Sequence, residues 1–171
     1  MNRRRFVKTG LIGGAVLTAA GAWVVWRDMR DADGGGPSRD RIALILGAIA
    51  PALLESVSPT DSLQRTAEID RIVAGVKAVI AVFPLAVQKE LGDLFRLLDI
   101  RLSRRLLTGV STEWGGADPA EVAAFLESWR TSRIGLLQSG YFALHDLVLG
   151  AWYADASTWA AIGYPGPPKV E

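Results

Sequence analysis

The sequence predicts an all-α protein, a single-domain bundle of about five helices that ends in an extended tail rich in proline and glycine. Three observations predict this fold. Apolar residues recur at helical spacing through most of residues 38–171, no stretch has the period of a strand, and 171 residues suit one domain. Half of the residues are apolar, so the helices can share one core.

The first helix is expected over residues 42–53, where five apolar side chains share one helical face. Pro51 should kink or end this helix, because proline has no N–H to donate and its ring crowds the preceding turn. A turn at Ser58-Pro59-Thr60 separates this helix from the next one.

Two further helices flank Pro84. The apolar stripe of residues 69–80 predicts a helix that ends at this proline, and residues 87–102 predict another helix whose first turn the proline supplies. The joint between them is short, so we expect the two helices to be antiparallel neighbours.

The fourth helix has a marked beginning, with an aspartate N-cap, a proline and a glutamate at Asp118, Pro119 and Glu121. A fifth helix is predicted over residues 137–152, weakened by Gly135 and Gly140, which cost about 1 kcal/mol each relative to alanine. Beyond it, three prolines and two glycines in residues 163–168 predict an extended tail.

Composition excludes several kinds of reactive site. The chain has no cysteine and one histidine, which rules out thiolate nucleophiles, disulfides, iron–sulfur clusters and zinc sites built from several histidines. Four of the 19 basic residues lie in the first 26 positions, so the rest of the chain carries 15 basic against 18 acidic residues. This balance predicts no nucleic-acid partner.

Two polar clusters remain as weak candidates. His145 and Asp146 are adjacent in a predicted helix, so their side chains are expected to point about 100° apart, and packing of His145 near Tyr141 or Leu149 is the favoured interpretation. A basic cluster at the end of the third helix is either a solvated face or a docking patch for an acidic partner; it comprises Arg96, Arg101, Arg104 and Arg105. We assign no catalytic, cofactor-binding or metal-binding residue.

The N-terminus carries an export motif. A basic segment precedes an apolar run at residues 9–26, and it resembles a twin-arginine (Tat) leader through Arg3, Arg4, Phe6 and Lys8. This resemblance implies a signal at residues 1–26, read by the Tat translocase, and a periplasmic location. The run is long enough to stay as an inner-membrane anchor, and cleavage near Ala22 is the alternative. Residues 27–37 hold three aspartates, three glycines and a proline, which predicts a flexible linker before the domain at residues 38–171.

Large aromatic side chains gather near the C-terminus. Tyrosine and tryptophan offer wide contact areas with few torsions to freeze, which is typical of protein-binding surfaces. The alternative is that these rings fill the core, which fits Tyr141 and Trp152 better than Trp159 and Tyr164. The residues predicted to bind a partner are Tyr141, Trp152, Tyr153, Trp159, Gly163, Tyr164, Pro165 and Gly166.

The same segment resembles a known family. The segments Gly140-Tyr141-Phe142, Ala151-Trp152-Tyr153 and Ile162–Pro168, with His145 and Trp159 between them, look like the gluconate 2-dehydrogenase subunit 3 family. The resemblance covers about the last 30 residues and the leader, while the middle of the chain matches only in being helical.

The resemblance implies a non-catalytic role. Members of that family accompany FAD-dependent dehydrogenases of the GMC type and escort the folded large subunit through the Tat pore, and a cytochrome subunit often takes the electrons. It therefore implies that this chain binds no cofactor itself and that FAD belongs to the large subunit of a sugar or alcohol dehydrogenase. The alternative from the residues alone is a free-standing helical module, exported by Tat because it folds fast, that binds an apolar ligand between its helices.

Overall fold

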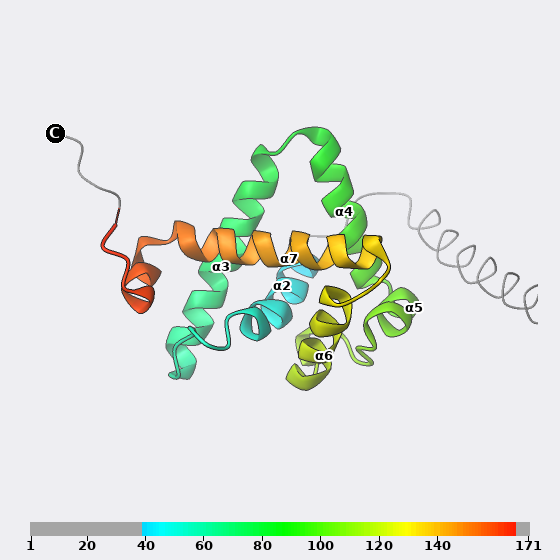
Figure 1. The fold of residues 1–171 in the computed structure, drawn as a ribbon, viewed down its shortest axis with the longest axis horizontal. Coiled ribbons are helices and arrows are strands. Elements are labelled where there is room, and N and C mark those ends of the chain that lie inside the picture. Colours follow the sequence, from blue (N-terminus) through cyan, green and yellow to red (C-terminus); the bar gives the residue numbers. More distant parts are fainter. Residues whose placement is uncertain (1–38, 167–171) are drawn as a thin grey trace, which may run out of the picture. The chain divides into compact units, whose positions relative to one another are not determined.

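The computed structural model describes residues 39–166 (Figure 1). The Tat motif, the apolar run, the linker at residues 27–37 and the last five residues lie outside the described residues. Within residues 39–166 every regular element is helical and none is a strand, which confirms the all-α class. No helix in this range is long and apolar enough to cross a membrane.

The five predicted helices are all present. They are α2 (Arg39–Leu53), α3 (Ser62–Val82), α4 (Leu85–Asp99), α6 (Pro119–Arg130) and α7 (Gly135–Ala154). The predicted count was nevertheless too low, because four short elements occur as well among residues 39–166. They are α5 (Arg101–Ser103), the π-helical turn η1 (Arg104–Thr108), and the 3₁₀ turns η2 (Trp114–Gly116) and η3 (Ala156–Ile162).

The third predicted helix was too long, because the chain leaves the helical conformation at Ile100. The backbone of Ile100 is extended, with φ −63° and ψ 122°, so the regular helix α4 ends at Asp99 and a second, short helix begins at Arg101. The π-turn that follows ends at Gly109, whose φ of +76° is a conformation that glycine adopts without steric cost.

Pro119 acts as predicted, whereas Pro84 and Pro51 differ from the prediction. Pro84 is the N-cap of α4, which begins at Leu85, so it lies just before the first turn and not in it. Pro119 is the first residue of α6, and its N-cap Asp118 accepts a hydrogen bond of 2.8 Å from the backbone N–H of Ala120. Pro51, however, does not end α2, which continues to Leu53. The backbone N–H of Leu54 still donates to the carbonyl of Ala50 at 3.0 Å, so the proline removes its own hydrogen bond without stopping the helix.

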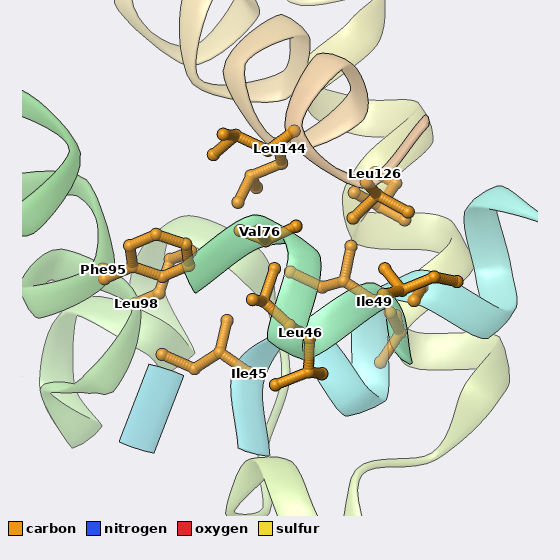
Figure 2. Packing of buried hydrophobic residues seen from close by; sticks show 14 of the residues in the cluster. Ile45, Leu46, Ile49, Val76, Phe95, Leu98, Leu126 and Leu144 are labelled. Atoms are coloured by element: carbon orange, nitrogen blue, oxygen red, sulfur yellow. The ribbon is translucent and has the colours of Figure 1, made fainter. Parts of the chain in front are cut away.

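The core forms around α2, whose Ile45, Leu46 and Ile49 are fully buried (Figure 2). Buried side chains of α3, α4, α6 and α7 surround them; those labelled in Figure 2 are Val76, Phe95, Leu98, Leu126 and Leu144. Five helices thus share one apolar cluster, with α7 in contact with both α3 and α6.

Two glycines let α7 pack closely on its neighbours. A Cβ on Gly75 of α3 would lie 3.1 Å from the Cβ of Ala151, and a Cβ on Gly140 of α7 would lie 2.6 Å from the Cζ3 of Trp129. Gly140 was predicted to weaken α7. In the structure, the missing side chain of Gly140 leaves room for the Trp129 ring of α6. The lower helix propensity of this glycine is therefore offset by closer packing between α7 and α6.

Candidate partner-binding surface

The C-terminal end of the described chain carries an exposed apolar patch, here named the C-terminal aromatic surface. Its exposed side chains have large accessible fractions: Tyr153 50%, Tyr164 45% and Ile162 41%. They enclose an open depression of about 720 Å³, which Trp159, Gly163 and Pro165 complete. The surface is built by the end of α7, by η3 and by the first residues of the tail, drawn in orange to red in Figure 1.

Asp155 fixes the joint between α7 and η3. Its carboxylate accepts a hydrogen bond of 2.9 Å from the backbone N–H of Ser157, and it pairs with the Nε of Arg71 at 3.0 Å. The hydrogen bonds from Ser157, and then the charge of Arg71, lower the pKa of Asp155. Thr158 adds a buried hydrogen bond of 2.8 Å from its hydroxyl to the carbonyl of Trp152. The base of the surface is therefore held to α3 and α7 by polar contacts.

Trp159 organises the tail. Its indole Nε1 donates to the carbonyl of Tyr153 at 2.8 Å, and the ring of Tyr164 packs edge-on against it, with centroids 5.2 Å apart. The backbone of Tyr164 donates back to the carbonyl of Trp159 at 3.0 Å. These contacts fold the tail onto η3 and leave one side of the Tyr164 ring exposed.

The two glycines of the predicted set have specific geometric roles. Gly163 has a φ of +68°, which reverses the chain after η3, and Gly166 has a φ of +96°. A Cβ on Gly166 would lie 3.2 Å from the Trp159 ring. The glycines of the tail therefore allow both the sharp turn and the close approach of the backbone to Trp159.

Trp152 and Tyr141 do not belong to this surface. Trp152 is only 2% exposed, and its indole donates a hydrogen bond of 2.9 Å to the Glu68 carboxylate. It is therefore a core residue, which corrects the expectation that it binds a partner. Tyr141 is half-buried and packs edge-on against Phe142. It lies twelve residues before Tyr153 in α7, or about 18 Å along the helix axis.

Glu68 is a buried acid that no sequence pattern singles out. It is 4% exposed, and its carboxylate accepts hydrogen bonds from the indole of Trp152 and, at 2.7 Å, from the hydroxyl of Ser58. Trp152 lies 84 positions further along the chain. No local pattern reports such a distant partner, so only the tertiary structure identifies this site.

His145 and Asp146 interact, contrary to the sequence expectation. The Nδ1 of His145 lies 2.9 Å from an Oδ1 of Asp146, because both side chains are long enough to bend toward each other although their Cβ atoms diverge. The expected packing near Tyr141 is present, with ring centroids 5.7 Å apart. Asp146 is 76% exposed. Within residues 39–166, no cluster of three or more histidine and acidic side chains could hold a metal ion.

The basic cluster is not one solvated face. Arg104 is 3% exposed, whereas Arg101 and Arg105 are exposed. Burial lowers the pKa of the Arg104 guanidinium, and the carboxylates of Glu113 and Asp99 oppose this shift. Its Nε is buried without a hydrogen-bond acceptor. The π-turn η1 therefore directs the first of its two arginines inward, which a helical pattern alone could not reveal.

A second depression lies between α2, η2 and α6. It has a volume of about 610 Å³, and its walls consist largely of alanine and glycine, with Trp114 on one side and Glu55 and Arg65 at the polar part of the lining. Small side chains keep this space open between the elements.

Comparisons of the chain with models of known protein families, with curated protein sequences and with solved structures find no match.

Proposed function

We propose that this chain is a non-catalytic small subunit and Tat export escort of a periplasmic, flavin-dependent sugar or alcohol dehydrogenase of the GMC type. FAD would then be bound by the large subunit, and a cytochrome subunit could receive its electrons. The observation that carries this proposal is the C-terminal aromatic surface, in which Tyr153 and Tyr164 are about half exposed. The leader that resembles a Tat signal, at residues 1–26, supplies the address for the complex.

The order within this surface supports a binding role. Trp159 is hydrogen-bonded to Tyr153, packed against Tyr164 and approached by Gly166, so the surface keeps its shape before a partner arrives. Preorganised aromatic side chains lose little conformational entropy on binding, which favours affinity per contact. The central depression of about 720 Å³ can receive an apolar side chain of the large subunit.

Co-purification from the native host tests the proposal. We expect the tagged chain to bring down a flavoprotein, and we expect that flavoprotein to stay in the cytoplasm when this chain is deleted. Replacing both tyrosines of the surface, Tyr153→Ala with Tyr164→Ala, should release the flavoprotein while the helical circular dichroism stays unchanged. Phe142→Ala is the matched control, because Phe142 is 49% exposed on the same helix but lies outside the surface.

Normal export of the dehydrogenase from the deletion strain would refute the escort role. Release of the flavoprotein by Phe142→Ala to the same extent as by the double variant would refute the assigned surface. The isolated chain is expected to show no sugar or alcohol oxidation with dye acceptors.

The depression between α2 and α6 favours a second candidate, a helical module that binds an apolar ligand. Trp114 lines this space, so a ligand bound there should change tryptophan fluorescence. Filling the space with Gly47→Leu should abolish that change, since a Cβ on Gly47 meets no atom within 4 Å and the added side chain would occupy the space itself.

A further inference from the structure

The hairpin of α3 and α4 ends in a run of ten residues with no charged or hydrogen-bonding side chain, residues 78–87, here named the apolar tip. Figure 1 shows the hairpin extending beyond α7. Two of its aliphatic side chains are strongly exposed, Leu85 at 82% and Val82 at 81%, and Val79 is 38% exposed. Ile80, Phe83 and Val87 are partly buried and pack against the core. Ala78, Ala81, Pro84 and Ala86 are exposed as well. The tip therefore exposes apolar atoms from both helices and from the joint between them.

The absence of polar side chains distinguishes the tip from an ordinary protein-binding surface. A protein interface generally has an apolar centre surrounded by a polar rim, whereas the exposed side chains of the tip, on both helices and in the joint, are all apolar. An environment that surrounds the tip would cover more of it than one flat surface can. We propose that the apolar tip inserts into the interfacial layer of a lipid bilayer that contains anionic lipids.

The charged residues on either side of the tip lie at the depth at which lipid phosphates are expected when the tip is inserted. Lys77 precedes the tip and Lys89 follows it, and no acidic residue occurs between Asp70 and Glu90. Lys77 lies five residues before Val82, about 7.5 Å along the α3 axis, and Lys89 lies four residues after Leu85, about 6 Å along α4. Interfacial helices bury about 5–10 Å of apolar structure, so both ammonium groups reach lipid phosphates when the tip is inserted.

One acidic group that lies beside the tip belongs to another helix. Asp146 of α7 lines the small hollow beneath the tip together with Phe83 and Val87. It is exposed and bonded to His145, and its charge favours water. Asp146 therefore limits insertion to the part of the hairpin that extends beyond α7.

The backbone of the tip also fits the interfacial layer. The side-chain amide of Gln88 donates to the carbonyls of Phe83 at 2.8 Å and Ala81 at 3.3 Å, which satisfies acceptors at the end of α3. The first turn of α4 has no side-chain cap, so its N–H groups need acceptors from outside. Lipid phosphates, ester carbonyls and water supply these acceptors at the interface, but the hydrocarbon core does not.

A single-cysteine experiment on the full chain tests the proposal. The chain has no cysteine, so Leu85→Cys creates one thiol for an environment-sensitive fluorophore. The matched control is Ser128→Cys, at an exposed position on α6, away from the tip in Figure 1. Because both proteins keep residues 1–38, any vesicle binding through the leader is the same in both. The vesicles contain phosphatidylethanolamine and phosphatidylglycerol with a spin-labelled quencher lipid.

We expect a blue-shifted emission and several-fold stronger lipid quenching for the label at position 85 than for the label at position 128. Adding Val82→Asp should remove both effects while the circular dichroism stays unchanged, and phosphatidylcholine vesicles should give weaker quenching. Equal quenching of the two labels, or full quenching that survives Val82→Asp, would overturn the proposal. A blue shift at position 85 in the absence of vesicles would assign the tip to a contact between proteins and would also overturn it.

Discussion

Replacing two glycines of α7 by alanine should have opposite effects on stability. Both Gly140 and Gly150 lie inside this helix, where alanine is favoured over glycine by about 1 kcal/mol. A Cβ on Gly150 meets no atom within 4 Å, so Gly150→Ala should raise the free energy of unfolding by most of that amount. A Cβ on Gly140 would lie 2.6 Å from Trp129 Cζ3 and 3.0 Å from its Cε3, which is a steric clash.

The clash at Gly140 is difficult to relieve. The indole of Trp129 donates to the carbonyl of Leu107 at 2.9 Å and packs edge-on against Phe125, so its ring cannot move without losing these contacts. Overpacking of a core costs about 1–3 kcal/mol, which equals or exceeds the gain in helix propensity. We therefore expect Gly140→Ala to lower the free energy of unfolding by up to about 2 kcal/mol, which places it about 1–3 kcal/mol below Gly150→Ala.

Urea denaturation followed by circular dichroism measures this difference as a shift of the unfolding midpoint at unchanged slope. The reasoning would be refuted if both variants were stabilised equally, since that would mean that Trp129 yields at no cost. A third variant, Gly140→Ala with Trp129→Phe, serves as a control. The smaller ring leaves room for the new Cβ, so Gly140→Ala should cost less in this background than in the native protein.

Two further predictions concern polar contacts. Trp152→Phe removes a hydrogen-bond donor from the buried Glu68 carboxylate, so it should lower the free energy of unfolding by about 1–3 kcal/mol in urea denaturation. The double variant Trp152→Phe with Glu68→Met should lose less stability than the sum of the two single variants, because it leaves no buried carboxylate without this donor. Asp155→Asn keeps an N-cap acceptor but removes the charge next to Arg71. Because the pKa of Asp155 is lowered on folding, its carboxylate stabilises the fold above the ordinary aspartate pKa of about 3.9 and loses this effect as the pH falls through the folded-state pKa. The difference in Tm between native protein and Asp155→Asn should therefore be largest near neutral pH and disappear in acid; a constant difference would contradict this reasoning.

The long helices were predictable because their signals are local. An apolar stripe extends over many residues, and the Asp118-Pro119 start of α6 satisfies its own backbone within one turn. Features that depend on distant residues were not predictable. Continuation of α2 through Pro51, burial of Trp152 against Glu68 and burial of Arg104 all depend on which elements pack together. The interruption at Ile100 is local, but no glycine or proline marks it in the sequence.

In the C-terminal aromatic surface, too, some features have local sequence signals and others depend on tertiary contacts. Exposure of Tyr153 and Tyr164 follows from the end of the helical period and from the tail composition, both of which are visible in the sequence. The grouping of those rings around Trp159 depends on hydrogen bonds and a ring contact that require the positive φ of Gly163. The sequence pattern at the apolar tip predicts two helix ends flanking Pro84. Its apolar residues satisfy the helical period equally well whether they are buried or exposed, and only the structure separates the two cases.

The two proposed contacts are compatible within one molecule. The apolar tip belongs to the joint of α3 and α4, while the C-terminal aromatic surface belongs to the end of α7, to η3 and to the tail, so no residue takes part in both. Both are connected to α7, which α3 crosses and contacts (Figure 1). Loss of the tip by Val82→Asp should therefore leave flavoprotein co-purification unchanged, and Tyr153→Ala with Tyr164→Ala should leave lipid quenching at position 85 unchanged. Cross-effects in either direction would mean that the two surfaces act as one site, and would contradict their separate assignment.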